Sequence, residues 1–209
     1  MDTDSEKYIK NISSPEDELL NELYRKTHTS FINPNMISGH LQGKFLEMLV
    51  HMLKPMHVLE IGTYTGYSAI SMARALPDGA MLHTIEINDE MEDICSEYFA
   101  RAGLQDKITL HIGDAREVLK KLDLSFDVIF IAGDKRQYPE YYSLAINRLA
   151  SDGFIVADNV LWDGKVCDPS QNDPMTEGIR RFNQLVKEDQ HIEQIIIPAR
   201  DGLMILRKL

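Results

Sequence analysis

The chain has 209 residues, of which 44% are hydrophobic, a formal net charge of −11 and two cysteines. These values allow one domain with a sizeable core, exclude a disulfide framework and disfavour nonspecific binding to a phosphate backbone. No apolar run reaches the roughly 20 residues that a membrane span needs, and the acidic start lacks the features of a secretory signal. We therefore expect a cytoplasmic protein without a membrane partner.

Apolar residues at helical spacing predict two helices, over residues 15–26 and 38–53, ahead of the first strand. Strand-like apolar runs then alternate with helical segments, which predicts a mostly parallel sheet covered by helices on both faces. The strands are expected at 57–61, 81–87, 108–112, 126–131 and 153–157, and the helices at 67–75, 89–102, 115–121 and 138–149.

The tail differs from this alternation, because a helix over residues 175–187 is followed by two apolar runs, 192–198 and 203–207, around a glycine turn. This pattern predicts a terminal hairpin. The sequence as a whole is interpreted as one domain, with a helical extension over residues 1–54 and a Rossmann-like α/β core over residues 55–209.

The most informative segment is the turn after the first predicted strand, where Gly62 and Gly66 follow Glu60. The glycines permit a tight turn that a ligand can approach closely, and Glu86 ends the second strand, where a carboxylate can accept hydrogen bonds from ribose hydroxyls. The spacing lacks the G-x-G-x-x-G cradle of a pyrophosphate, and Glu60 suits a cationic amino-acid end. These features favour S-adenosylmethionine over NAD.

The segments LEIGTYTGYS (59–68), FIAGDKRQY (130–138) and DNVLWDGKV (158–166) resemble the cation-dependent class I O-methyltransferases, the caffeoyl-CoA and catechol O-methyltransferase group. The resemblance implies a seven-stranded sheet with an antiparallel last strand, and usually a homodimer. The cofactor pocket that it implies comprises Ser38, Glu60, Gly62, Thr63, Ser68, Glu86, Asp114, Ala115 and Ala132.

One position departs from the family pattern. Family members carry a metal-binding aspartate at the position of Ala132, and this residue acts together with the later pair that corresponds to Asp158 and Asn159. The resemblance thus implies a magnesium or calcium site weakened by the missing carboxylate. Asp134 is an alternative ligand, because residues two apart in a strand point to the same side. A metal-independent enzyme and a protein that binds cofactor without turnover are the other interpretations.

On the acceptor side, the resemblance makes Lys135 the candidate general base and places Asp163 and Trp162 beside the substrate. A lysine near a cationic cofactor has a lowered pKa, which makes neutral amine available to take a proton. The leading hypothesis is methyl transfer to a hydroxyl of a catechol-like small molecule. Methylation of a hydroxylated uridine in tRNA is the alternative within the same fold.

Overall fold

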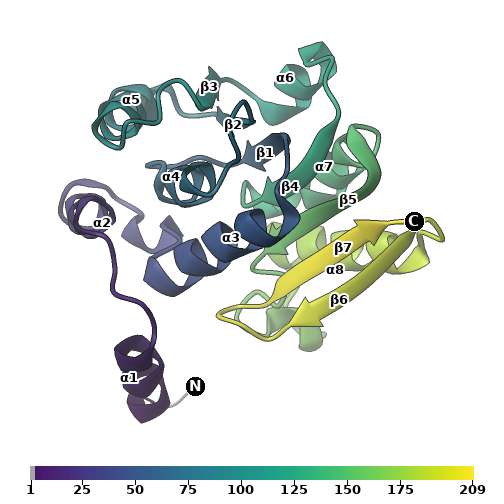
Figure 1. The fold of residues 1–209 in the computed structure, drawn as a ribbon. Coiled ribbons are helices and arrows are strands. Elements are labelled where there is room, and N and C mark those ends of the chain that lie inside the picture. The colour runs from purple at the N-terminus through teal and green to yellow at the C-terminus, as the bar shows by residue number, and fades with distance from the viewer. Residues whose placement is uncertain (1–2) are drawn as a thin grey trace.

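The computed structural model describes residues 3–209, and a seven-stranded sheet in the order β3-β2-β1-β4-β5-β7-β6 lies at its centre (Figure 1). Strands β1 to β5 are parallel, and β7 is antiparallel to both of its neighbours. The predicted architecture is therefore confirmed. The strands are β1 (His57–Ile61), β2 (Met81–Glu86), β3 (Ile108–Ile112), β4 (Phe126–Ile131), β5 (Leu149–Asp158), β6 (Ile192–Ile197) and β7 (Leu203–Lys208).

Helices cover both faces of the sheet, and two apolar clusters lie between the layers. Successive strand residues enter opposite clusters: Val58 packs with the helices α2 to α5, whereas Leu59 packs with α6 to α8. The helices are α1 (Thr3–Ile12), α2 (Glu18–Ser30), α3 (His40–Leu53), α4 (Tyr67–Arg74), α5 (Glu92–Arg101), α6 (Ala115–Lys121), α7 (Tyr138–Ala145) and α8 (Pro174–Glu188). Between residues 3 and 209 the chain also forms the single-turn 3₁₀ helices η1 (Pro34–Met36), η2 (Asp89–Met91), η3 (Lys135–Gln137) and η4 (Lys165–Cys167).

Several element boundaries correct the sequence predictions. The helix expected over 138–149 ends at Ala145, and β5 begins at Leu149 instead of 153, because Leu149 pairs with Phe126 beyond a register shift in β4. From residue 3 onward, the α-helices α1, α2 and α3 precede β1, and α1 was not predicted. Helix α2 begins after Asp17, whose carboxylate accepts hydrogen bonds from the backbone N–H groups of Leu19 and Leu20.

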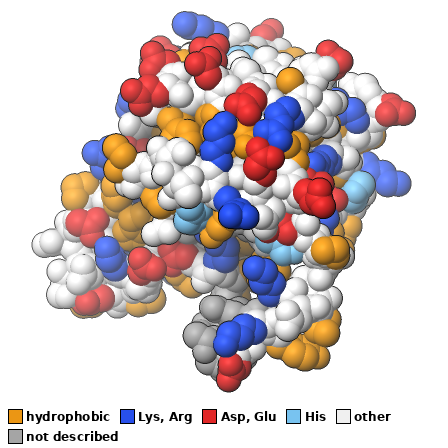
Figure 2. All heavy atoms as spheres, turned by 90° about the vertical axis from the view of Figure 1, so that its left-hand side faces the viewer, with side chains coloured by type: hydrophobic (Ala, Val, Ile, Leu, Met, Phe, Trp, Pro, Cys, Tyr) orange, Lys and Arg blue, Asp and Glu red, His pale blue; other side chains and the backbone are white. Residues whose placement is uncertain are grey.

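Charged side chains dock α2 on α5. Arg101 forms an ion pair of 2.6 Å with Glu22, Lys26 lies 3.0 Å from Glu97, and the Tyr98 hydroxyl donates to Glu22 at 2.8 Å. Figure 2 shows side chains of both signs interspersed over this face of the molecule. None of the helices between residues 3 and 209 combines the length and the apolar character that a membrane crossing requires.

Candidate functional site

The chain order of the strands reverses between β1 and β4, so a crevice for a ligand is expected at the carboxyl ends of these two strands. Gly62 begins the loop after β1 with a φ of +98°, and a Cβ atom there would lie 2.8 Å from the backbone nitrogen of Gly133. The loops after β1 and β4 thus touch backbone to backbone. Gly66, with a φ of +90°, ends the turn at the start of α4.

Glu60 is fully buried at the end of β1. Its Oε2 accepts a hydrogen bond of 2.5 Å from the Thr84 hydroxyl, which in turn accepts one from Thr63. Burial raises the pKa of Glu60 to about 7, although the nearby hydroxyl groups of Ser68 and Thr84 oppose this rise. The other carboxylate oxygen, Oε1, has no protein partner. Because buried polar atoms are normally hydrogen-bonded, this oxygen is fit to accept a hydrogen bond from a ligand.

Glu86 ends β2 and is 8% exposed. Its two oxygens accept hydrogen bonds from the backbone N–H groups of Tyr64, at 2.7 Å, and Asn88, at 2.9 Å. Burial raises the pKa of the carboxyl group, and these N–H donors oppose the rise. The contact with Tyr64 fixes the loop after β1 relative to β2 and orients the Glu86 carboxylate. Each oxygen of Glu86 keeps a lone pair that could accept a hydrogen bond from a ribose hydroxyl.

Two loops after strands share one local arrangement. Asp114 precedes α6 and Asp134 precedes η3, and each carboxylate accepts hydrogen bonds from the backbone N–H and the guanidinium of the arginine two residues later. Arg116 and Arg136 lower the pKa of their aspartates. Asp114 follows the end of β3, where the implied cofactor pocket has it, and both carboxylates are occupied by the arginine two residues later.

Lys135 lies at the carboxyl end of β4 with a side chain that is 7% exposed. Its Nζ donates to the Tyr138 hydroxyl at 2.6 Å, and this hydroxyl donates to the backbone oxygens of Ile131 and Asp158. Burial lowers the pKa of Lys135 to about 8, against the opposing effect of Asp158 and Asp201. The amine is thus held on a rigid support near the pKa that suits proton transfer at neutral pH.

The loop after β5, the predicted acceptor side of the crevice, has several residues with positive φ. Asn159, Trp162 and Asp163 all have φ between 50° and 57°, the left-handed region that non-glycine residues seldom occupy. The backbone N–H of Asp163 donates to Asp201 at 2.6 Å, and the indole nitrogen of Trp162 is buried without a protein partner. Such strain concentrates at functional sites, so the predicted substrate-side residues lie in a suitable segment.

Of the other predicted cofactor residues, Ala115 is buried at the first turn of α6, and Ala132 follows β4 next to the Gly62 loop. Ser38 lies in the loop before α3, and its carbonyl accepts a hydrogen bond of 2.6 Å from Arg200. Arg200 belongs to the turn before β7, so this turn and the loop before α3 meet. These placements are compatible with the predicted pocket, and the individual ligand contacts remain predictions.

Two functional candidates were missed from the sequence. Asp201 faces the Asp158 end of β5 because β7 pairs with β5, with Asp158 opposite Leu203. No role was predicted for Tyr138, although its hydroxyl accepts a hydrogen bond from the Lys135 amine. The long-range pairing of β5 with β7 has no local sequence signal, whereas the spacing of Lys135 and Tyr138, three residues apart, could have suggested their contact.

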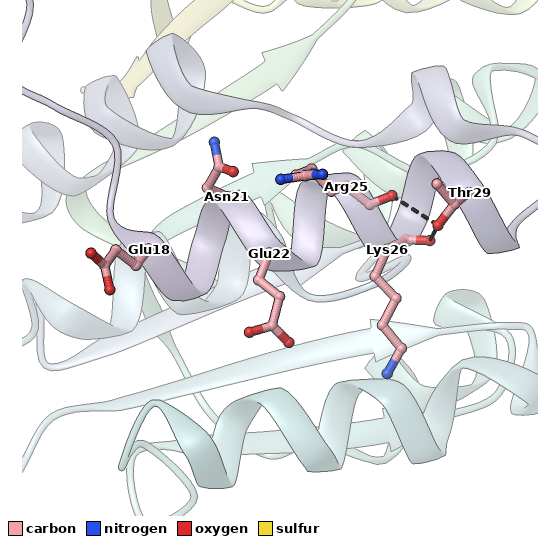
Figure 3. A pocket seen from close by; sticks show the side chains of 6 residues that line it. All are labelled: Glu18, Asn21, Glu22, Arg25, Lys26 and Thr29. Carbon is pink, nitrogen blue, oxygen red and sulfur yellow. Dashed lines mark hydrogen bonds between the residues drawn. The ribbon is translucent and has the colours of Figure 1, made fainter.

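A separate hollow runs along α2, lined by Glu18, Asn21, Glu22, Arg25, Lys26 and Thr29. Figure 3 shows Glu22 and Lys26 pointing away from Asn21 and Arg25, and the Thr29 hydroxyl donates to backbone carbonyls of its own helix. Glu22 and Lys26 are also the residues that pair with α5. The polar groups of this hollow therefore dock two helices, and the catalytic candidates lie elsewhere.

A model of a family described as O-methyltransferase matches residues 10–209. The chain is 38% identical over 160 residues to a catechol O-methyltransferase of Niastella koreensis, covering 75% of this chain and 72% of the relative. It is 35% identical over 181 residues to a caffeoyl-CoA O-methyltransferase of Pinus taeda, covering 80% and 70%. An O-methyltransferase of Streptomyces achromogenes in complex with SAM superposes with a TM-score of 0.90 at 30% identity, covering 98% and 96%.

Proposed function

Because the chain belongs to the O-methyltransferase family, we propose that it binds S-adenosylmethionine at the ends of β1 and β2 and methylates a hydroxyl group of a small aromatic molecule. The observation that carries the cofactor assignment is the unpaired, buried Oε1 of Glu60 beside the Gly62 turn. A carboxylate oxygen there suits the cationic amino group of the cofactor, and Glu86 suits its ribose.

When bound, S-adenosylmethionine supplies an electrophilic methyl group. Lys135 is the group of this chain that takes the proton of the acceptor hydroxyl, since its pKa of about 8 leaves part of the amine neutral. Tyr138 holds the amine at the end of β4, where both side chains are buried. Asp163 and Trp162 lie beside the acceptor in this proposal, as the resemblance of the loop after β5 implies.

The cofactor assignment is tested by calorimetric titration of S-adenosylmethionine into the native protein and into Glu60→Gln. Loss of a charge-assisted hydrogen bond is expected to weaken cofactor binding by about 10- to 100-fold. Glu92→Gln, an exposed position in α5, is the matched control and should bind as the native protein does. Equal affinity of the native protein and Glu60→Gln would refute the assignment of Glu60.

Methylation of tRNA, the alternative acceptor class, finds little support in the charged groups. The Arg180 guanidinium donates to backbone carbonyls of Lys165, Val166 and Asp168, and Lys120 pairs with Glu117 at 2.8 Å. Two cations on helices, Arg180 and Lys120, are therefore engaged within the chain. A small-molecule acceptor is the better match to a surface with a net charge of −11.

We also propose a homodimer, formed through an exposed apolar stripe on α3. Leu41, Met48 and Met52 are 41%, 58% and 69% exposed, and their spacing places them on one side of the helix. The double substitution Met48→Glu and Met52→Glu should give a monomer in light scattering at micromolar protein. Met175→Glu on α8 is the control that should stay dimeric. A native protein that is already monomeric would contradict this assembly.

A further inference from the structure

The oxygen donors that a divalent cation would need are largely missing or engaged. Ala132 offers a methyl group at the position where family members are expected to carry a carboxylate. Both Asp134 oxygens accept hydrogen bonds from the Arg136 guanidinium, with Nε at 3.0 and 2.9 Å. A metal at Asp134 would therefore have to displace the Arg136 guanidinium from both carboxylate oxygens.

The remaining pair is also partly occupied. One oxygen of Asp158 accepts the backbone N–H of Asn159 at 2.9 Å. Among residues 3–209, no three His, Cys, Asp or Glu side chains are grouped so that they could hold a metal ion. Magnesium takes oxygen ligands in near-octahedral geometry, so one free carboxylate oxygen and one amide oxygen would leave most positions to water and hold the ion only weakly. The residues present do not fit the expected cation.

A nitrogen base is instead part of the chain at the same place. Lys135 is fixed by Tyr138, whose ring is fully buried and whose hydroxyl donates to the carbonyl of Asp158 at 2.9 Å. A Cβ atom at Gly178 would lie 2.3 Å from the Lys135 carbonyl, so α8 packs directly against this turn. The position of the amine is therefore set by close packing on one side and by hydrogen bonds on the other.

We propose that this chain transfers methyl groups without a divalent cation, and that its acceptors are phenols for which a single hydroxyl group is sufficient. A chelating metal requires two neighbouring oxygens on the acceptor, whereas a base requires only the hydroxyl that reacts. This inference rests on the proposed methyl transfer. The expected acceptors are then phenols in general, and a second hydroxyl group beside the reacting one is not required.

The step balances with one hydroxyl group. The hydroxyl proton moves to the neutral Nζ of Lys135, and the acceptor oxygen forms a bond to the methyl carbon. The bond between this carbon and the sulfonium sulfur breaks, and its electron pair stays on sulfur. The products are the methyl ether, the neutral thioether and the Lys135 ammonium ion, which solvent deprotonates before the next cycle.

The test combines turnover with direct metal binding. Turnover of 4-hydroxycinnamate and of 3,4-dihydroxycinnamate is measured with excess EDTA and again with millimolar MgCl₂. Both acceptors should be methylated, at rates that agree within about twofold between the two conditions. Loss of turnover in EDTA with recovery in magnesium would overturn the metal independence. Absence of turnover under both conditions would overturn the proposed function and, with it, the acceptor class.

Calorimetry with MgCl₂ and CaCl₂ gives a readout that does not depend on activity. The native protein should show no binding at millimolar metal, and Ala132→Asp should gain it, since the new carboxylate adds the missing ligand. Ala132→Ser is the control for the change in volume and should stay without metal. Binding of either metal to the native protein at up to millimolar concentration would overturn the inference.

Discussion

Replacement of Lys135 by methionine is expected to lower kcat for methyl transfer by about 10²- to 10⁴-fold, the contribution of a positioned general base. Methionine retains most of the volume and removes the amine, so the packing against Tyr138 should survive. Cofactor affinity should stay unchanged, because Lys135 lies at the end of β4 and the cofactor is assigned to the ends of β1 and β2. Turnover with a saturating phenol and calorimetry with S-adenosylmethionine separate the two effects.

The pH dependence gives a second readout for the same residue. Because burial lowers the pKa of Lys135 to about 8, turnover of the native protein should rise with pH through that value and level off above it. Lys187→Met, at an exposed position of α8, is the control and should keep the native rate and profile. Full turnover in Lys135→Met would show that another group takes the proton.

Replacement of Gly62 by alanine is expected to reduce the free energy of unfolding by about 3 kcal/mol, the sum of a positive φ and an overpacked contact. The new Cβ would meet backbone atoms of Ala132 and Gly133 at 2.8 to 2.9 Å, and neither loop can rotate a side chain out of the way. Separation of the two loops should also abolish cofactor binding. Urea denaturation and calorimetry measure the two consequences.

Gly103→Ala is the matched control, because Gly103 has a φ of +67° and no heavy atom within 4 Å of the added Cβ. The free energy of unfolding of Gly103→Ala should fall by only about 1 kcal/mol, the part due to the positive φ, and this variant should bind cofactor normally. If the two alanine variants showed the same decrease in the free energy of unfolding, close packing of the loops after β1 and β4 would not contribute to stability.

The strands with strong apolar runs were predicted to the residue, as β1, β3 and β4 show. The start of β5 was not, because Ala150, Ser151 and Asp152 are polar or small, and Asp152 has a φ of +59°. Only pairing with β4, a contact remote in sequence, makes Leu149 part of a strand. Helix α1 lacks a long apolar stripe and gave no comparable signal.

The site could be predicted where function follows strand ends, since Glu60, Glu86 and Lys135 lie where the apolar runs stop. The features that could not be predicted depend on which side chains contact each other in the folded chain. The occupation of Asp134 by Arg136 follows from a local turn geometry, and the place of Asp201 follows from the hairpin. The missing carboxylate at position 132 could be found from the sequence, whereas the pairing of Asp134, the alternative ligand, with Arg136 needed the structure.

The most direct test of methyl transfer is product analysis with S-adenosylmethionine labelled in its methyl group and a panel of phenols. The account predicts one labelled methyl group on a phenol oxygen, formed in equal amount with S-adenosylhomocysteine. A protein that binds the cofactor with the affinity changes expected for Glu60→Gln, yet leaves every phenol unlabelled, would contradict the proposed reaction.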